Sequence, residues 1–398
     1  MGDEMNTFLQ WRELLEQELT DNIIPFWMRF SIDLEYGGYL TCLEQDGTVY
    51  DTYKQMWMQW REVYMFAALF NSRFSDPRYL QLARHGFDFL SLYGRKSAGN
   101  YAYMLDRKGR VLAEKADGME IFSGSFAAVA CAELFRATGE KQFKEEAFTA
   151  LEIYRAAVAS AEANKANIPD GWGHLAHPMI ELNTLQVMRN AFGSGIQTDE
   201  IDRCIEKIFR FRHPEKKVFL ENAPASGGFD LNSQQGRFTN PGHALEGMAF
   251  ILEELRLRRN SDPALVEHYL PQTLDAVKTS FDYGWDDEQG GIWYFRDILG
   301  KPVAKLEFML KAWWPQNEAA TAALRAYEMS GDPVFLTEFC KLEEFCWQHL
   351  RDLEYGEWFA YAAVDGRQVH SYKGSQFKGF FHIPRHLLNC IDVCDRML

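Results

Sequence analysis

The segment Glu35-Tyr36-Gly37-Gly38-Tyr39, followed by Gln45-Asp46-Gly47, is one of four similar stretches from which the fold can be predicted. Each stretch joins glycine to aromatic residues and precedes a second turn signal, a pattern typical of a small β-hairpin. Their recurrence in tandem indicates an internal repeat. The other three stretches are Gly99 to Tyr103, Glu288 to Tyr294 and Glu354 to Trp358.

The spacing of these stretches gives the number of repeats. Gly38 and Asn100 lie 62 positions apart (100 − 38), and Gly290 and Gly356 lie 66 apart (356 − 290). The 190 positions from Asn100 to Gly290 (290 − 100) hold three further steps of about 63 residues. Six units of roughly 65 residues would therefore fill the chain.

Long segments between the hairpins show the apolar spacing of α-helices, and tight turns such as Ser330-Gly331-Asp332-Pro333 separate them in pairs. Six helical hairpins closing on themselves give an all-α double ring of twelve helices, with the short β-hairpins at one end and residues 1–398 in one catalytic domain. The alternative is an open superhelical array, which would need polar capping repeats. The clearest helical segments are Phe8 to Phe26, Trp57 to Asn71, Tyr79 to Leu92, Phe122 to Thr138, Phe143 to Ala161, His243 to Arg259 and Ala319 to Met329.

The composition restricts the class of protein. With 398 residues, of which 47% are hydrophobic, the chain can bury a large core. A net charge of −15 disfavours nucleic acid and anionic membranes as partners, because both attract clustered Lys and Arg. Seven cysteines without a paired framework indicate reduced thiols. We see neither a signal peptide nor an apolar run that approaches the length of a membrane span, and expect a cytoplasmic protein.

Two histidines are the first candidates for chemistry. His243 follows Asn240-Pro241-Gly242, and His382 lies between Phe381 and Ile383-Pro384-Arg385. An imidazole exchanges a proton near neutral pH, so two of them on opposite sides of one carbon could move a proton from one face to the other. The alternatives are packed or capping histidines, and a metal site built on His243 and Glu246. No His-Glu-x-x-His or Cys-x-x-Cys motif is present, so we predict no metal.

Further polar residues stand in apolar or aromatic surroundings. Arg61 lies within an apolar helix and needs a partner, which could be Glu62 or a substrate oxygen. Trp314 and Glu318 offer a stacking face and an acid, which suit a sugar, although paired tryptophans also pack in cores. If the hairpins share one end of the ring, these side chains gather there with His177 and Arg237.

At these residues the chain resembles the N-acylglucosamine 2-epimerase superfamily, which includes N-acetylglucosamine, cellobiose and mannose 2-epimerases and mannose isomerases. The resemblance extends from Ile24 to the C-terminal helix and is densest at Arg237 to Gly247, Trp313 to Ala319, Glu354 to Phe359 and Lys378 to Arg385. It implies an (α/α)6 barrel, in agreement with the repeat count. It also implies that His243 and His382 are the proton-transfer pair. By the same matches, the residues that line the sugar site are Arg61, Arg237, Glu246, Trp314 and Glu318.

Within the superfamily the sequence motifs are most similar to those of the N-acetylglucosamine epimerases. That branch has a Lys/Arg-rich segment that is linked to stimulation by ATP. Here Ser160 to His174 holds only Lys165, and His177 and Glu181 stand where that branch has small apolar residues. The sequence therefore leaves open the N-acetyl group of the sugar and any stimulation by ATP. The expected chemistry requires no cofactor, and a homodimer is compatible with it.

The expected activity is interconversion of C2 epimers of an aldohexose through a cis-enediolate, a reaction in which His243→Ala or His382→Ala should abolish proton exchange at C2. Return of the proton to C1 would instead make the enzyme an aldose–ketose isomerase. A glycoside hydrolase using two of Glu246, Glu318 and Glu357 is a more distant alternative, because helical barrels host such enzymes too. A sugar-binding module without turnover is the remaining class.

Overall fold

The computed structural model describes residues 2–96, 99–115, 118–163 and 171–398, and most of them are helical. A π-helical turn, Glu18–Ile23, separates the first two helices. The helices are α1 (Gly2–Gln17), α2 (Ile24–Phe30), α3 (Met56–Phe70), α4 (Pro77–Tyr93), α5 (Phe122–Thr138), α6 (Lys141–Ala163), α7 (Ala176–Phe192), α8 (Thr198–Phe209), α9 (Pro241–Arg258), α10 (Pro263–Gly284), α11 (Trp313–Ser330), α12 (Pro333–His349) and α13 (His382–Met397).

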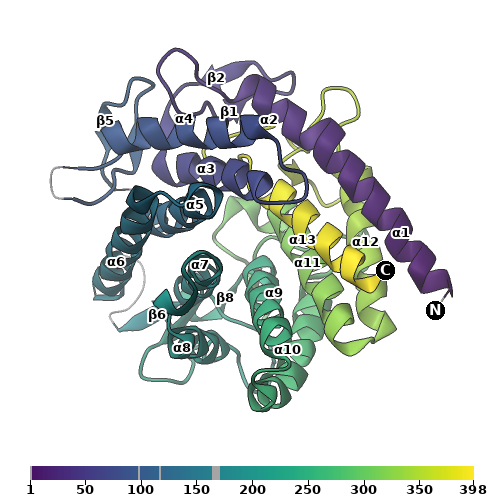
Figure 1. Ribbon diagram of the computed structural model, residues 1–398. Helices are drawn as coiled ribbons and strands as arrows, with labels where there is room; N and C mark the ends of the chain where they lie inside the picture. Colours follow the sequence, from purple (N-terminus) through teal and green to yellow (C-terminus); the bar gives the residue numbers. More distant parts are fainter. Residues whose placement is uncertain (1, 97–98, 116–117, 164–170) are drawn as a thin grey trace.

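These helices form two concentric rings, as Figure 1 shows in a view along the ring axis. Helices α3, α5, α7, α9, α11 and α13 make the inner ring, in which each packs on the next. Outside them lie α4, α6, α8, α10 and α12, each against the inner helix that precedes it, and α1 lies against α13. Contact between α13 and α1 closes the ring, so the predicted double ring is confirmed and the open superhelix is wrong.

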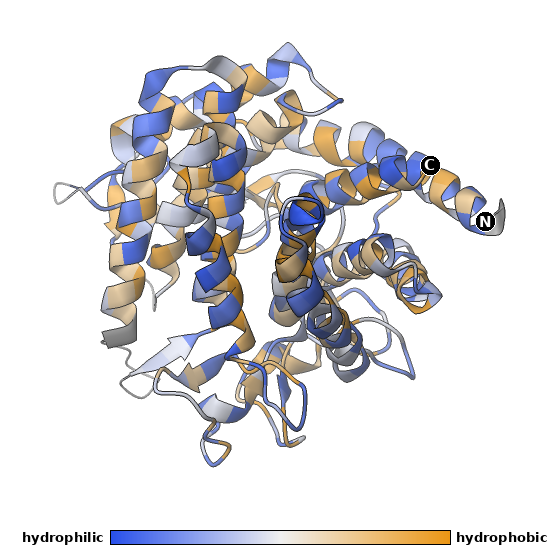
Figure 2. Ribbon diagram, turned by 60° about the horizontal axis from the view of Figure 1, so that its bottom comes forward, coloured by the Kyte–Doolittle hydropathy of each residue, from blue (hydrophilic) through white to orange (hydrophobic). Residues whose placement is uncertain are grey.

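Burial differs between the rings, as their positions require. Nearly every residue of α9 and of α11 is buried, whereas the outer helix α1 carries alternating hydrophilic and hydrophobic bands (Figure 2). One helical segment, Met119–Thr138, is long and apolar enough to cross a membrane, and 72% of its apolar 18-residue window is buried. It contains α5, which packs against α3, α6 and α7, so its apolar surface is explained by the core.

The tight turns between inner and outer helices follow the predicted helix-stop and helix-start chemistry. Gly139 and Gly331 end their helices in the left-handed conformation, with φ of 73° and 70°. Three of the outer helices, α4, α10 and α12, begin with a capping aspartate and a proline in the first turn. The capping carboxylates of Asp76, Asp262 and Asp332 accept from the backbone N–H groups of Arg78, Leu265 and Val334, respectively.

Short antiparallel strands lie at one end of the rings and mostly pair neighbouring units. The pairs β1–β2 and β4–β5 each lie within one unit, and each of the other pairs joins segments that precede successive inner helices. The pairs and triplet are β1 (Cys42–Leu43) with β2 (Val49–Asp51); β3 (Lys54–Gln55) with β4 (Met104–Leu105) and β5 (Val111–Ala113); β6 (Trp172–His174) with β7 (Asn222–Pro224); β8 (Phe238–Thr239) with β9 (Arg296–Asp297); and β10 (Lys311–Ala312) with β11 (Tyr361–Ala362).

All four predicted hairpin stretches are present as single β-bridges that close tight turns. A fifth bridge, Arg212 to Phe219, was not predicted, because its turn contains no glycine, whereas each of the others contains at least one. There Lys217 takes the left-handed conformation, with φ of 55°. The four predicted bridges are Ile32 to Tyr39, Arg95 to Tyr101, Trp285 to Ile292 and Arg351 to Trp358.

Three of these hairpins are held by a buried lysine–aspartate pair, which we call the hairpin ion pair. In each, the aspartate opens the turn and accepts backbone N–H groups within it, while a lysine from a later segment reaches its other oxygen. Burial makes such a pair depend on both partners, since neither charge has water as a substitute. The pairs are Lys54 to Asp33 at 2.9 Å, Lys311 to Asp286 at 2.7 Å and Lys373 to Asp352 at 2.7 Å.

Asp33→Asn should therefore destabilise the protein by about 3–5 kcal/mol, the usual cost of stranding one partner of a buried ion pair. Lys54, whose side chain is fully buried, would lose its counter-charge. Denaturant unfolding measures the loss. The double variant Asp33→Asn/Lys54→Met should recover much of it, and equal losses in the single and double variants would contradict this account.

Two helix boundaries differ from the prediction. Helix α11 begins at Trp313 rather than at Ala319, since Pro315 lies in the first turn, where a missing N–H costs nothing. The expected single helix from Phe8 to Phe26 is interrupted by the π-helical turn, and Pro25 starts α2.

Candidate active site

The N-termini of the inner helices meet at the end of the barrel that carries the strands. His382 is the first residue of α13, His243 the third of α9, and Trp314 the second of α11. His177 is the second residue of α7, and Arg61 lies in α3. Helix N-termini carry partial positive charge, so this end of the barrel favours negative charge in a bound molecule.

His243 is held by a carboxylate that the sequence did not reveal. Its Nδ1 donates to Glu221 Oε2 at 2.9 Å, which leaves Nε2 for other chemistry. The side chain is 24% exposed, so it can meet a ligand. Burial lowers the pKa of His243, but the negative charge of Glu221 and the hydrogen bond to it outweigh burial, so the pKa lies above its usual 6.5. His243 therefore tends to hold its proton near neutral pH.

His382 is held in the same manner but in a different electrostatic setting. Its Nδ1 donates to Glu318 Oε1 at 2.8 Å, which again leaves Nε2 available. Burial and the positive charges of Arg61 and Arg385 lower the pKa of His382 well below 6.5. His382 is therefore neutral where His243 is protonated, and environments that separate two pKa values in this way are typical of an acid–base pair.

Trp314 connects the two imidazoles. Its ring centroid lies 5.0 Å from that of His243 and 5.6 Å from that of His382. A hydrogen bond to neighbouring Tyr294 and burial of all but 7% of its surface fix the indole in place. A small molecule that contacts this indole is therefore within reach of both histidines.

Arg385 joins the helices that carry these residues. Its Nη2 donates to Glu318 Oε1 at 2.6 Å and to Glu246 Oε1 at 2.5 Å, so it links α13 to α11 and to α9. The carboxylates of Glu246 and Glu318 and the imidazole of His382 lie close enough to hold a metal ion. Arg385 already supplies the positive charge there, and both carboxylates are engaged.

Arg61 is a buried cation that points into aromatic surroundings. Its guanidinium carbon lies 4.2–4.5 Å from the ring centroids of Trp57, Phe126 and Phe381. Among the described residues it has no ion pair, and its Nε has no hydrogen-bond partner. Burial lowers the pKa of Arg61 to about 9, so it remains charged at neutral pH. The guanidinium is therefore a charge without an ion-pair partner among the described residues, and its positive charge acts on His382.

The predicted alternative for Arg61, an ion pair with Glu62, is wrong. Glu62 points to the other side of α3, where its carboxyl group is bonded to Ser31. Burial raises the pKa of Glu62 to about 8, so it is mainly protonated at neutral pH. It therefore offers Arg61 no negative charge.

Arg237 and His177 lie at this end but have other contacts. Arg237 binds Asp297 through Nε at 2.9 Å and two backbone carbonyl groups of residues 231 and 232 through Nη1. These bonds hold the loop that leads into α9. The ring of His177 lies 5.6 Å from that of His174, whose Nε2 is 3.6 Å from Glu221 Oε2. His177 thus belongs to the surroundings of Glu221.

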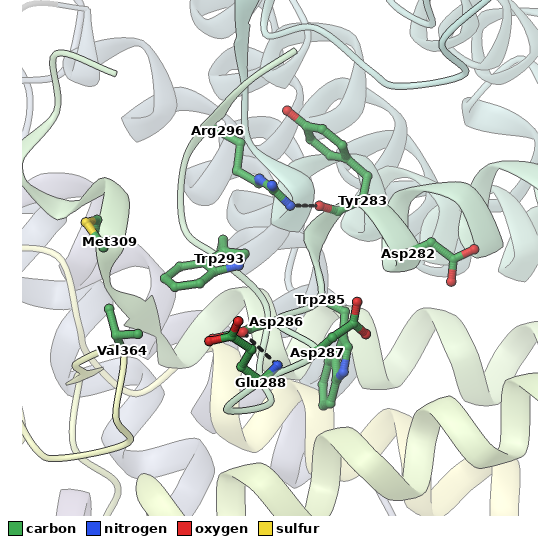
Figure 3. A pocket seen from close by; sticks show the side chains of 10 residues that line it. All are labelled: Asp282, Tyr283, Trp285, Asp286, Asp287, Glu288, Trp293, Arg296, Met309 and Val364. Atoms are coloured by element: carbon green, nitrogen blue, oxygen red, sulfur yellow. Dashed lines mark hydrogen bonds between the residues drawn. The ribbon is translucent and has the colours of Figure 1, made fainter. Parts of the chain in front are cut away.

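A surface pocket of about 680 Å³ lies apart from the histidines (Figure 3). Trp293, Glu288 and Arg296 line it, together with the end of α10, and none of the predicted site residues does. The next residue, Tyr294, contacts Trp314 with ring centroids 5.8 Å apart. The pocket and the histidine site thus both contact residues 293–294 of the chain, but different side chains line them.

The remaining acid considered for glycoside hydrolysis is also engaged. Glu357 is 1% exposed, and its two oxygens accept hydrogen bonds from Lys378, Trp358 and Trp27. With Glu246 and Glu318 bound by Arg385, none of the three acids is placed as a free proton donor. The groups positioned for proton transfer are the two histidines.

Comparisons with known proteins identify the family of this chain. The profile of the N-acylglucosamine 2-epimerase family matches residues 38–385. The N-acylglucosamine 2-epimerase of Homo sapiens is 36% identical over 409 residues, which cover 100% of this chain and 92% of that protein.

Solved structures agree on the fold. That of a D-mannose isomerase has a TM-score of 0.79 at 19% identity and covers 97% of this chain and 98% of its own. That of the cellobiose 2-epimerase from Bacillus thermoamylovorans B4167 has a TM-score of 0.77 at 20% identity and covers 98% of this chain and 100% of its own. At these identities the structures support the closed helical barrel.

Proposed function

This chain belongs to the N-acylglucosamine 2-epimerase family and is a carbohydrate epimerase, and on that premise we propose that it interconverts N-acetylglucosamine and N-acetylmannosamine through a proton-transfer pair, His243 and His382. The observation that carries the proposal is the placement of two carboxylate-held imidazoles against one indole, Trp314. The choice of sugar is supported by full-length similarity to a protein named for N-acylglucosamine.

In the proposed reaction, the open-chain sugar lies over Trp314. Neutral His382 removes the C2 proton through Nε2, and the electron pair moves onto the C1 carbonyl oxygen to give an enolate, which would be an enediolate only for a sugar with a hydroxyl group at C2. Protonated His243 then delivers its Nε2 proton to the opposite face of C2, which reforms the carbonyl group and inverts the centre. General acid–base steps of this kind typically contribute about 10²–10⁴-fold.

The negative charge of the enolate oxygen is stabilised by groups already in position. The guanidinium of Arg61 has no ion-pair partner among the described residues, and the helix N-termini carry partial positive charge. Glu246 and Glu318 take no proton in this scheme, because Arg385 and His382 occupy them. The chemistry uses side chains of this chain alone.

The pH dependence of kcat/KM should be bell-shaped, with limbs set by the two histidines. The pKa of His382 is lowered, so protonation of this base should reduce activity only below pH 6.5, in the acid limb. The pKa of His243 is raised, so loss of this acid should place the alkaline limb above pH 6.5. The reverse reaction also requires one proton in total on the two histidines, so its kcat/KM should have the same pH dependence.

Glu221→Gln tests that assignment. It removes the charge that raises the pKa of His243, so the alkaline limb should move to lower pH while the acid limb stays. Initial rates from pH 5 to 10 measure both limbs. Movement of the acid limb instead would show that His243 is the base in the resting enzyme.

The experiment that tests the function is proton NMR in D₂O with N-acetylglucosamine, N-acetylmannosamine, mannose, glucose, fructose and cellobiose. Deuterium at C2 with accumulation of the epimer is expected for the N-acetylated pair. Exchange with mannose and glucose alone would show that the substrates are unmodified aldoses. Accumulation of a ketose would show that the enzyme is an aldose–ketose isomerase. Failure of every sugar to exchange would overturn the proton-transfer pair.

The same samples with and without ATP test nucleotide stimulation. The expectation rests on residues 160–174, of which 164–170 lie outside the described residues. The sparsity of basic residues there leads us to propose that ATP does not change the rate.

A further inference from the structure

Glu357 occupies a backbone position that two of the four other hairpins, those closed by Tyr39 and Ile292, give to glycine. Gly38, Gly291 and Glu357 each come directly before the second residue of the bridge that closes their turn. All three have left-handed φ values, of 68°, 82° and 58° respectively. This conformation is unfavourable for a residue with a Cβ atom, and such residues cluster at functional sites. A glutamate here therefore needs an explanation from its side chain.

The side chain of Glu357 fills a buried site with three donors. Oε1 accepts from Lys378 Nζ at 2.7 Å and from the backbone N–H of Trp358 at 2.8 Å. Oε2 accepts from the indole N–H of Trp27 at 2.5 Å. Its own backbone N–H donates to Asn22 Oδ1 at 2.8 Å. The carboxylate thus connects the last hairpin to the start of the chain and to the segment before α13.

That segment, residues 373–381, leads directly into His382. Lys378 Nζ also donates to the carbonyl oxygen of Lys373 at 2.7 Å, which folds the segment back on itself. The ring of Phe380 lies 6.1 Å from that of Trp27, the indole that Glu357 binds. The Glu357 carboxylate therefore holds the segment at Lys378, while the backbone carbonyl oxygen of Glu357 accepts from Lys373 Nζ at 3.2 Å.

We propose that Glu357 is a positioning residue that fixes His382 by anchoring Lys378 and the segment between them. This rests on the proposed role of His382 in proton transfer. Glu357 touches no reacting atom, because its oxygens are occupied and its side chain is buried. Lys378 lies four positions before His382, which is in the first turn of α13. A displacement of this turn would change the angle at which His382 Nε2 meets C2 of the sugar.

The hairpin ion pairs separate this role from ordinary support of the fold. The hairpins that Tyr39 and Ile292 close each have one lysine–aspartate pair, whereas the hairpin that Trp358 closes has Lys373 with Asp352 and also Lys378 with Glu357. A second pair in which both side chains are buried is described only in this last hairpin, since Arg107, the second cation at Asp33, is one third exposed. The pair Asp286 and Lys311 is therefore a matched control.

The test compares two charge-balanced double variants. Glu357→Gly/Lys378→Met introduces the glycine of the hairpins closed by Tyr39 and Ile292 and strands no charge. It should stay folded with kcat lowered by about 100-fold, the scale expected for a displaced catalytic group, and with KM little changed. The control, Asp286→Asn/Lys311→Met, should lose thermal stability while kcat is retained. Equal losses of kcat in both, or full activity in the first, would overturn the proposal.

A second variant covers failure of the first to fold. Glu357→Gln keeps the shape of the side chain but weakens its bonds to Lys378 and Trp27, and the same fall in kcat at constant KM is expected. The thermal melting temperature of Glu357→Gln should be close to that of the control, Asp286→Asn/Lys311→Met. A KM effect with normal kcat would contradict positioning.

A measurement independent of turnover separates this proposal from the proposed function. Histidine-labelled protein allows the titration of His382 to be followed by NMR in the wild type and in both double variants. If His382 is displaced, its titration moves in the Glu357 variant and not in the control. An unchanged titration together with unchanged kcat would reject the positioning role, whereas a wild type without exchange would reject only the epimerase mechanism.

Discussion

His382→Ala is expected to lower kcat for C2 epimerisation by about 10²–10⁴-fold, the contribution of one general acid–base group. His382 is the imidazole that is neutral in the resting enzyme, because burial and two nearby arginines lower its pKa. Without it, no described group near Trp314 is available to remove the C2 proton from the face that it serves. The measurement is the initial rate of epimer formation, in both directions, with deuterium content at C2 followed in the same samples.

A matched histidine variant controls for loss of an imidazole. His349 lies outside the site, where its Nδ1 is 3.1 Å from the carbonyl oxygen of Gly366. His349→Ala should retain kcat, and both variants should melt cooperatively. An active His382→Ala protein would refute the two-histidine mechanism, and an active double variant lacking both His243 and His382 would do so even more directly.

Arg61→Met should lower kcat by about 10²–10³-fold, the usual effect of removing one donor from an oxyanion site. Arg61 is a buried guanidinium without an ion-pair partner among the described residues, so in the proposed mechanism its charge is available for the enolate oxygen. The effect should lie in kcat more than in KM, since the ground-state sugar has no negative charge for Arg61 to stabilise. Steady-state kinetics on both epimers provide the measurement.

Arg325 offers a matched control for the loss of a buried arginine. It lies in α11 and bonds to the carbonyl oxygen of Ala249 at 2.9 Å and to Asn389 at 3.2 Å, so it connects the same inner helices away from the histidines. Arg325→Met should cost stability and leave kcat in place. Arg61→Lys, which keeps the charge but not the fork, should recover part of the activity. An Arg61→Met enzyme with only a raised KM would show that Arg61 binds the sugar without stabilising the intermediate.

The fold could be predicted because each repeat contains local sequence signals for turns and helix ends. Turns such as Gly331-Asp332-Pro333 state where one helix ends and the next begins, and the glycine pairs at Gly37 and Gly290 mark the hairpins. The hairpin at Arg212 escaped prediction because Lys217 adopts the left-handed conformation without glycine. The start of α11 was misplaced since a proline in the first turn has the same sequence appearance as a proline that ends a loop.

The predicted site residues are those whose types stand out in an apolar context, such as His243, His382 and Arg61. Their partners were harder to find. Glu221 reaches His243 from the strand region of a preceding connection, 22 positions away, and no local pattern marks it. Arg385 was visible as a charge in an apolar segment, but its bonds to two other helices depend on the tertiary fold. Sequence periodicity places residues on a helix face, whereas these partners are brought together by ring closure.

Closure of the ring between α13 and α1 has a consequence for the order in which the protein is made. Five inner helices leave the ribosome before His382, and domains begin to fold from the N-terminus during synthesis. Until α13 emerges, the nascent barrel exposes the apolar sides of α11 and α1 and lacks the imidazole that begins the reaction. We therefore expect the last inner helix to seal the core and, under the proposed mechanism, to complete the active site in one event. A chain that ends before His382 should then be inactive and expose apolar surface.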